Sequence, residues 1–220
     1  MKKEEVRARI QEIGILPSVR VASRDLAHFA AETVYAAGIP IVEITLTIPG
    51  ALEVIGELAR RLPDLVVGAG TVLDEESARR CVDAGAMFLT SPGLVRKVVA
   101  YAKLTGVTVL PGALTPTEVI AAWKAGGDFV KLFPTSQVGG SQYVRALKVP
   151  LPQIPLIATG GVNQLNASDF ILAGATAIGL GGELLPNEAL HFRQEDRIHE
   201  LARRFLSKVK DARAMRETYY

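Results

Sequence analysis

The segment from Ala121 to Pro134 reads AAWKAGGDFVKLFP, in which an amphipathic stretch stops at Ala125-Gly126 and a short apolar run follows. Glycine readily adopts the left-handed conformation that closes helices, so this segment predicts a helix, its cap and then a strand. The same pattern recurs at Ala37-Gly38, Ala84-Gly85 and Ala173-Gly174. Such repetition indicates a helix–strand unit that the chain uses many times.

The apolar runs supply eight strand candidates, Ile15 to Val21, Ile39 to Thr45, Leu65 to Gly70, Met87 to Thr90, Val107 to Pro111, Phe129 to Phe133, Leu156 to Thr159 and Ala177 to Leu180. Helix starts lie between them: Thr115-Pro-Thr-Glu118 combines an N-cap, a proline at the first helical position and a glutamate that can return a hydrogen bond. Strands that alternate with helices pair in parallel, and eight units without a linker favour one closed barrel. The predicted fold class is therefore α/β, a single (β/α)8 TIM barrel.

The 220 residues are expected to form one domain with three parts. Residues 1–14 are predicted to form an extra N-terminal helix, with Val6, Ile10 and Ile13 on one side. The barrel core is predicted over residues 15–186 and a long C-terminal helix over residues 187–220. At this length the loops of the barrel must be brief.

Composition excludes several functional classes. With 49% hydrophobic and 22% charged residues the chain is globular, and its 25 basic and 23 acidic side chains are scattered, so no nucleic-acid partner is expected. A single cysteine cannot form an internal disulfide, and the charged N-terminus lacks the apolar region of a signal peptide. The longest uncharged stretch, Val149 to Ser168, is rich in prolines and amides, which argues against a membrane span. These features predict a cytoplasmic protein.

The histidines give no sign of a metal site. His28, His191 and His199 fall in predicted helices, and none is spaced for metal binding with another ligand. The sequence therefore predicts chemistry without a metal.

Ionisable residues interrupt strands that should be apolar. One side of a barrel strand faces the side chains of the interior, and the other side faces the helices. A charged residue in the middle of such a strand is therefore unusual and indicates a structural or functional role. Alternation places Glu43 in the barrel interior and Lys131 on the face of its strand that also carries two phenylalanines. It also places Ser18 and Arg20 together on one side of the first strand.

Glu43 and Lys131 have two interpretations. The first is a structural ion pair, since buried charges are usually paired. The second is catalytic: burial disfavours the charged form of an amine, a neutral amine can attack a carbonyl, and a nearby carboxylate can carry the proton. Position favours the second, because active sites of this fold gather where strands end and Lys131 is followed at once by Phe133-Pro134 and Gly139-Gly140.

Two glycine-rich loops offer an anion site. Thr159-Gly160-Gly161-Val162 follows the seventh strand, and Gly179-Leu180-Gly181-Gly182 follows the eighth. Loops in these positions often hold a phosphate through backbone N–H groups, although each glycine pair alone could simply turn the chain. Arg20 has the fork geometry that binds a carboxylate or phosphate, with a packing or surface role as its alternative.

Six motifs, in order, resemble the 2-keto-3-deoxy-6-phosphogluconate (KDPG) and 4-hydroxy-2-oxoglutarate (KHG) aldolases. They are Val42-Glu-Ile-Thr45, Gly68-Ala-Gly-Thr-Val72, Ser91-Pro-Gly93, Pro111-Gly112 with Thr115-Pro-Thr-Glu118, Lys131-Leu-Phe-Pro134 and Thr159-Gly-Gly-Val162. The resemblance runs from about Arg20 to Gly182. It implies a class I aldolase of carbohydrate metabolism, of the Entner–Doudoroff type, on a (β/α)8 barrel. Such enzymes need no metal or cofactor, are usually homotrimers, and cleave a 2-keto-4-hydroxy acid to pyruvate and an aldehyde.

The resemblance also implies roles for single residues. Lys131 matches the Schiff-base lysine, and Glu43 matches the acid/base glutamate. The substrate-contacting positions and the phosphate loop of the family are combined with the anion-binding candidates described above. The resulting substrate-binding set is Arg20, Thr47, Thr71, Pro92, Phe133, Thr159, Gly160, Gly161, Gly181 and Gly182.

Two departures from the residues that are common in the family leave the identity of the substrate open. Thr47 stands where many members carry a carboxylate-binding arginine, which makes Arg20 the candidate replacement. Gly182 stands where many place a phosphate-binding serine, so the preference for phosphate is in question. The expected substrates are KDPG, KHG or both, with a 6-phosphogalactonate analogue or a non-phosphorylated sugar acid as alternatives.

Two other classes of protein also fit the pattern. One is a phosphate-binding barrel isomerase or epimerase in which Lys131 acts only electrostatically. The other is a non-catalytic protein that binds a keto acid in the same pocket.

Overall fold

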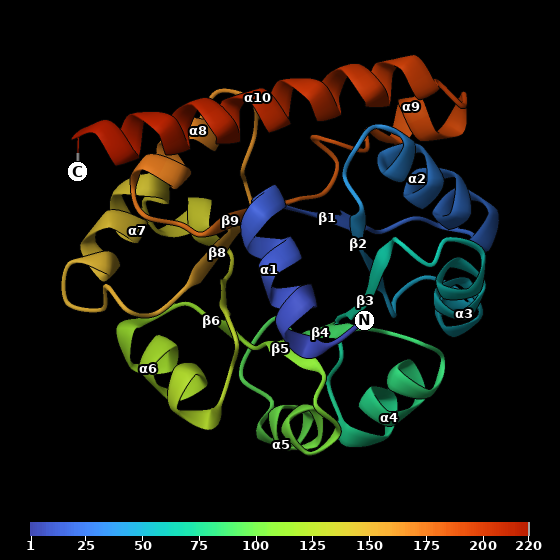
Figure 1. The fold of residues 1–220 in the computed structure, drawn as a ribbon, viewed down its shortest axis with the longest axis horizontal. Coiled ribbons are helices and arrows are strands. Elements are labelled where there is room, and N and C mark those ends of the chain that lie inside the picture. Colours follow the sequence, from blue (N-terminus) through green and yellow to red (C-terminus); the bar gives the residue numbers. More distant parts are fainter. Residues whose placement is uncertain (220) are drawn as a thin grey trace.

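The computed structural model describes residues 1–219 and confirms the predicted parallel α/β barrel (Figure 1). Nine strands form one sheet in the order β5-β4-β3-β2-β1-β9-β8-β7-β6, and neighbours pair in parallel. The strands are β1 (Ile15–Val19), β2 (Ile41–Thr45), β3 (Val66–Gly70), β4 (Phe88–Thr90), β5 (Thr108–Leu110), β6 (Gly112–Ala113), β7 (Val130–Leu132), β8 (Leu156–Thr159) and β9 (Ala177–Leu180).

The fifth predicted strand, Val107 to Pro111, contains β5, and a ninth, unpredicted short strand, β6, follows directly after Pro111. Proline has no N–H to contribute to a ladder, so β5 pairs with β4 while β6 pairs with β7. The two ends of the sheet are joined here: Lys131 N donates to Pro111 O at 3.0 Å, and Asp128 N donates to Val109 O at 2.9 Å. The barrel is thereby closed.

Helices surround the barrel, as Figure 1 shows. They are α1 (Lys3–Ile13), α2 (Arg24–Ala36), α3 (Ala51–Arg61), α4 (Glu75–Asp83), α5 (Arg96–Thr105), α6 (Pro116–Ala125), the 3-10 helix η1 (Thr135–Val138), α7 (Gly140–Lys148), α8 (Ala167–Leu172), α9 (Asn187–His191) and α10 (Glu195–Tyr219). The predicted capping box of α6 is present: Glu118 N donates to Thr115 Oγ1 at 3.3 Å, and Thr115 N donates to Glu118 Oε2 at 2.9 Å.

The prediction of one helix from residue 187 onward is wrong. The chain forms α9 and α10 instead, and Arg193 between them has a φ of 51°. Its guanidinium pairs with Asp25 and lies 4.6 Å from the centroid of the Phe29 ring, both on α2. The break therefore lets Arg193 reach α2, a contact between distant parts of the sequence.

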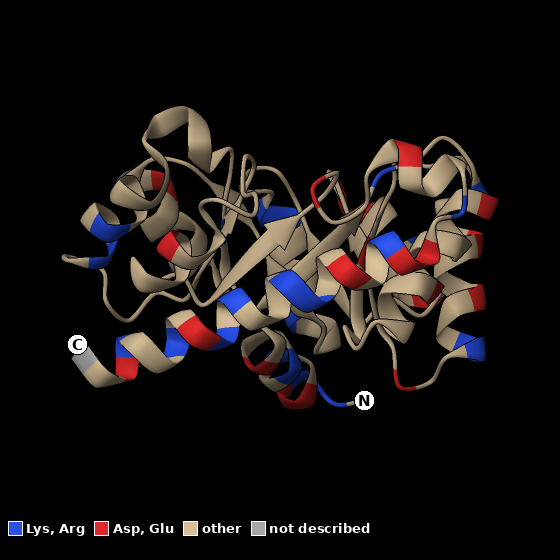
Figure 2. Cartoon of the chain, turned by 90° about the horizontal axis from the view of Figure 1, so that it is seen from above, with Lys and Arg blue, Asp and Glu red and all other residues tan. Residues whose placement is uncertain are grey.

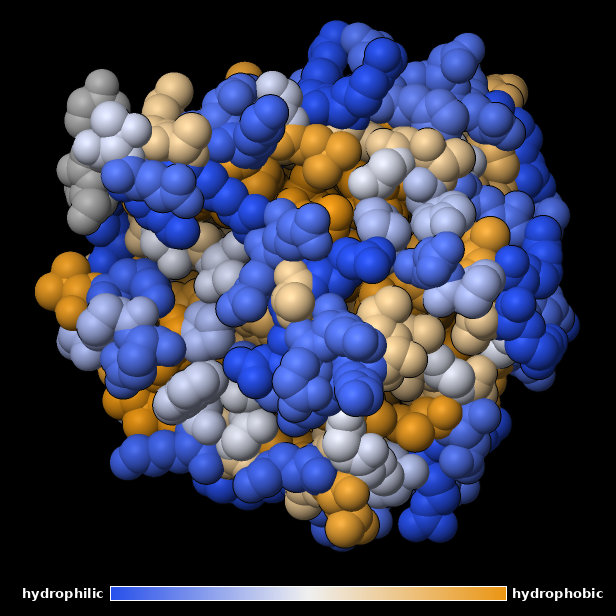
Figure 3. Space-filling view, viewed as in Figure 1, coloured by the Kyte–Doolittle hydropathy of each residue, from blue (hydrophilic) through white to orange (hydrophobic). Residues whose placement is uncertain are grey.

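Charged residues of both signs are interspersed over the outer helices (Figure 2). On the face that carries α1, apolar residues form separate patches between hydrophilic ones (Figure 3). Within residues 1–219, no helix has the length and apolar character needed to cross a bilayer.

The extra N-terminal helix α1 is present and lies across one end of the barrel (Figure 1). Its Val6 and Ile10 are buried. Lys3 Nζ lies 2.9 Å from Asp128 Oδ2, and the same oxygen accepts the Val109 N–H at 2.9 Å. Asp128 therefore fastens α1 to the place where the barrel closes.

We expect Asp128→Asn to lower the free energy of unfolding by about 1–3 kcal/mol, because it weakens charge-assisted hydrogen bonds to a nearly buried carboxylate. The measurement is denaturant unfolding. The matched control is Glu4→Gln on the exposed side of α1, which should change stability by less than about 0.5 kcal/mol. Equal stability of the two variants would show that the Asp128 contacts do not hold the helix.

Candidate active site

Strand register brings Glu43 into the barrel interior, as alternation predicted. Glu43 pairs with Ser18 on β1 and with Gly68 on β3, and it is 1% exposed. A Cβ at Gly70 would lie 2.3 Å from Glu43 Oε1. The bare backbone at the end of β3 therefore provides the space that the carboxylate occupies.

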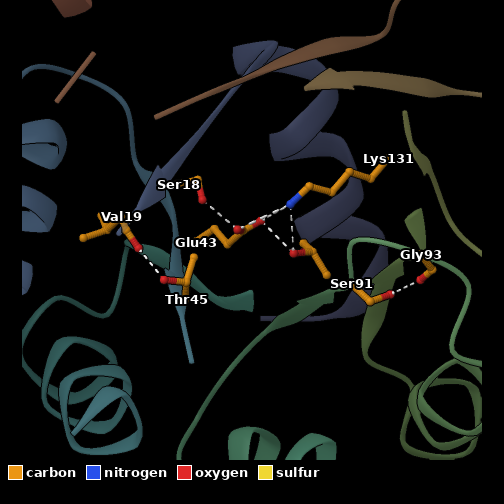
Figure 4. Close-up of polar contacts among 8 residues, drawn as sticks. Ser18, Val19, Glu43, Thr45, Ser91, Gly93 and Lys131 are labelled. Atoms are coloured by element: carbon orange, nitrogen blue, oxygen red, sulfur yellow. Dashed lines mark hydrogen bonds and ion pairs between the residues drawn. The ribbon is translucent and has the colours of Figure 1, made fainter. Parts of the chain in front are cut away.

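Three side chains contact the Glu43 carboxylate (Figure 4). Lys131 Nζ lies 3.2 Å from Oε2, Thr90 Oγ1 donates to Oε2 at 2.7 Å, and Ser18 Oγ donates to Oε1 at 2.7 Å. Lys131 Nζ also lies 3.4 Å from Thr90 Oγ1. The lysine and the glutamate, which are far apart in the sequence, thus meet inside the barrel.

The surroundings of Glu43 act on its pKa in opposite directions. Burial raises the pKa, while the positive charge of Lys131 and the hydrogen bonds from Thr90 and Ser18 lower it. The balance lies below the ordinary value of 4.5. Glu43 is therefore an ionised carboxylate at neutral pH and can accept a proton.

A cavity of about 450 Å³ opens above this pair, where the strands end. Its lining comprises Ser18, Arg20, Thr71, Pro92, Lys131, Phe133, Thr159, Gly160, Gly161, Val162, Gly179, Leu180, Gly181, Gly182 and Glu183. This set contains most of the expected substrate-binding residues together with Lys131. A keto acid bound in this cavity would therefore contact the lysine amine.

Thr47 does not line this cavity. It borders a neighbouring hollow with Leu26 and Phe192, and its Oγ1 accepts a hydrogen bond from Arg20 Nη1 at 3.1 Å. Arg20 lines both spaces. Its guanidinium, carried on an exposed side chain, therefore stands at the mouth of the cavity, where it can contact an anion.

The glycine loop after β8 requires glycine for two reasons. Gly160 and Gly161 have φ values of 87° and 78°, a region that side chains disfavour. A Cβ at Gly161 would also lie 2.0 Å from Ser136 Oγ. The loop therefore brings bare backbone to the cavity wall.

Thr71 has an unusual backbone for a β-branched residue, with a φ of 61°. Such a conformation costs roughly 1–3 kcal/mol and persists where the surroundings enforce it. Thr71 lines the cavity, so this unusual backbone conformation places a hydroxyl-bearing side chain in the wall.

The predicted site set omits Ser18 and Glu183 of the lining and Thr90, which contacts Glu43; it also omits Val162, Gly179 and Leu180 of the lining. Ser18 had a signal, because alternation placed it on the same strand face as Arg20. Glu183 had one too, because it directly follows the glycines of the last loop. Thr90 had none, since its contact with Glu43 depends on packing across the barrel interior. Within residues 1–219, the site included, no cluster of three or more His, Cys, Asp or Glu side chains could hold a metal ion.

The model of the KDPG and KHG aldolase family matches residues 6–201. The chain belongs to this family. It is therefore an aldolase, a carbon–carbon lyase. It is 32% identical to the KHG/KDPG aldolase of Escherichia coli K12 over 86% of this chain and 89% of that protein. It is 31% identical to the 2-dehydro-3-deoxy-phosphogluconate aldolase of Pseudomonas aeruginosa over 96% of this chain and 97% of that protein.

Solved structures of the family share the fold. One is the KDPG aldolase of Legionella pneumophila, with pyruvate captured at low pH as a covalent carbinolamine intermediate. It has a TM-score of 0.83 and 28% identity, covering 90% of this chain and 96% of that one. A structure described as native KDPGal has a TM-score of 0.82 and 32% identity, covering 90% and 95%.

We expect Thr90→Val to raise the pKa of Glu43, because it removes a hydrogen bond that favours the carboxylate while keeping the side-chain shape. The measurement is a ¹³C NMR titration of labelled glutamate, with Glu43→Gln to assign the resonance. Thr45→Val is the matched control, since the Thr45 hydroxyl donates to Val19 O rather than to Glu43. An unchanged Glu43 titration in Thr90→Val would refute the assigned role.

Proposed function

We propose that this protein is a class I aldolase that reversibly cleaves KDPG to pyruvate and glyceraldehyde 3-phosphate, KHG to pyruvate and glyoxylate, or both. The observation that carries the proposal is the Lys131 amine, which lines the cavity and lies 3.2 Å from the ionised, buried Glu43. The names of the relatives support the choice of substrates. No metal or cofactor is required, because the electron sink is an iminium formed on Lys131.

The cycle begins with formation of that iminium. A proton passes from Lys131 to Glu43, the free amine attacks the keto carbon, and the resulting carbinolamine loses water, which takes the proton with it. In the iminium, the positive nitrogen can accept an electron pair. The carboxylate of Glu43 is then ready for a second proton.

Cleavage follows when Glu43, directly or through an intermediary, receives the proton of the carbon-four hydroxyl. The bond between carbons three and four breaks, its electron pair moves toward the iminium nitrogen, and the aldehyde leaves. Glu43 returns the proton to carbon three of the enamine, and water then releases pyruvate from Lys131.

Binding is assigned to the remaining lining residues. Arg20 supplies an anion contact, with Thr47 supporting it through their hydrogen bond. Thr71, Pro92, Phe133 and Thr159 form the walls, and the backbone N–H groups of the loops at Gly160-Gly161 and Gly181-Gly182 face the distal end of the substrate. The working form is proposed to be a homotrimer.

Incubation with pyruvate and sodium borohydride should leave a reduced pyruvate adduct on Lys131, detected by intact mass and peptide mapping. Lys131→Arg, which keeps the charge but lacks a nucleophilic amine, should give no adduct and no cleavage. Glu43→Gln should slow cleavage by a factor of about 100 to 10,000, the usual contribution of general acid–base catalysis. Wild-type rates in either folded variant would disprove the assignment, and an unmodified wild-type protein that still binds pyruvate would favour an isomerase or a binding protein.

One observation favours a second candidate, an aldolase for a non-phosphorylated sugar acid. Glu183 directly follows the last glycine loop, lines the cavity and is exposed. No ion pair within residues 1–219 involves it. A carboxylate repels a phosphate dianion but accepts hydrogen bonds from sugar hydroxyls, so it suits an uncharged distal end.

We expect Glu183→Gln to raise the ratio of kcat/KM for KDPG to that for its non-phosphorylated analogue by about tenfold, equivalent to ~1.4 kcal/mol. The physical reason is removal of like-charge repulsion at the distal end of the cavity. Pyruvate release measures both rates. Glu53→Gln is the control, because Glu53 is an exposed residue of α3 that does not line the cavity. An unchanged ratio would eliminate Glu183 as a selector against phosphate.

A further inference from the structure

Glu43 has almost no exposed surface, although the Lys131 amine that it contacts lines the cavity in which the substrate would bind. Its side chain is 1% exposed, and it is absent from the residues that line the cavity within the described chain. Of its three contacts, Thr90 is fully buried, whereas Ser18 and Lys131 line the cavity. Ser18 and Lys131 are therefore the two contacts of Glu43 that also face the cavity.

Lys131 cannot carry this proton during cleavage, because its nitrogen is then bonded to the substrate as an iminium. Ser18 remains available: its Oγ donates to Glu43 Oε1 at 2.7 Å (Figure 4), whereas Thr90 Oγ1 donates to the other carboxylate oxygen, Oε2. A hydroxyl can donate one hydrogen bond while it accepts another. Ser18 is thus suited to connect the substrate to the buried carboxylate.

We propose that Ser18 is the proton relay between the substrate and Glu43, an inference that rests on the proposed Schiff-base function. In cleavage, the proton of the carbon-four hydroxyl moves to Ser18 Oγ, and the Ser18 proton moves to Glu43 Oε1. The electron pair of the breaking carbon–carbon bond moves toward the iminium nitrogen. The same path runs in reverse when carbon three of the enamine receives its proton, after which both Ser18 and Glu43 are restored.

The position of Ser18 supports this role. It lies on β1, whose residues Ile15, Leu16 and Val19 are buried and apolar, and it is the strand partner of Glu43. Strand hydrogen bonds fix the backbone at both residues, so the two side chains are held within hydrogen-bond reach before the substrate arrives. A rigid element is the setting in which a proton-transfer distance is best maintained.

A purely structural role for Ser18 predicts something different. In that case its hydrogen bond only holds the carboxylate and helps lower the Glu43 pKa. Loss of this hydrogen bond would shift the acid limb of the pH profile of proton exchange on pyruvate to higher pH. The exchange rate on the plateau of that profile would not change. If Ser18 is a proton relay, loss of its hydroxyl lowers the exchange rate on the plateau.

The test compares two variants of the same shape, Ser18→Thr, which keeps the hydroxyl, and Ser18→Val, which lacks it. The readout is exchange of the pyruvate methyl protons in D₂O, followed by ¹H NMR across the pH range, which needs only pyruvate. We expect the plateau exchange rate to fall about 100-fold or more in Ser18→Val, the lower range for general acid–base catalysis, and to stay within about threefold of wild type in Ser18→Thr. Ser18→Ala gives the same comparison if the valine side chain prevents folding.

Borohydride trapping of pyruvate on Lys131 is run in parallel for every variant. An adduct in Ser18→Val with slow exchange locates the defect after iminium formation and supports the relay. A wild-type plateau in Ser18→Val, or equal losses in the valine and threonine variants, would overturn it. Absence of the adduct in the wild-type protein would overturn the Schiff-base function itself, a separate result.

Discussion

A carboxylate and an ammonium group 3.2 Å apart, with almost no exposure to water, set the arrangement of this barrel's interior. Removing two charges from water costs several kcal/mol per ion unless further hydrogen bonds satisfy them. Thr90 and Ser18 supply those bonds to Glu43, and Gly70 supplies the space. The strands that carry these groups must therefore keep one register, because a shift of one residue would turn each side chain to the opposite face.

The two ends of the barrel meet different requirements. At one end, Asp128 joins the Lys3 side chain of α1 to the Val109 N–H, and every group in this contact stabilises the closed sheet. At the other end, Thr71 keeps a strained backbone and Gly160 and Gly161 occupy left-handed conformations. The contacts that close the sheet and the strained backbone that lines the cavity therefore lie at opposite ends of the strands.

Sequence pattern predicted the barrel and placed Glu43 and Lys131 inside it, because alternation along a strand is a local property with a fixed period. It failed where long-range contacts decide the local conformation. The break at Arg193 depends on Asp25 and Phe29 of α2, and the left-handed Thr71 lies in a position that propensity disfavours. The contact of Thr90 with Glu43 likewise arises only once the strands have closed around the interior.

The location of each group explains how one family can keep a reaction while its substrates differ. Lys131 and Glu43 sit on strands, where a change disturbs the register of neighbours and the balance of a buried ion pair. Arg20 and Glu183 are exposed at the mouth, where a substitution changes the charge at the entrance of the cavity but costs little stability. Substitutions at the mouth are therefore expected to cost less stability than substitutions in the buried ion pair. In the proposed mechanism, strand residues break the carbon–carbon bond, and the exposed residues at the mouth select the aldehyde that leaves.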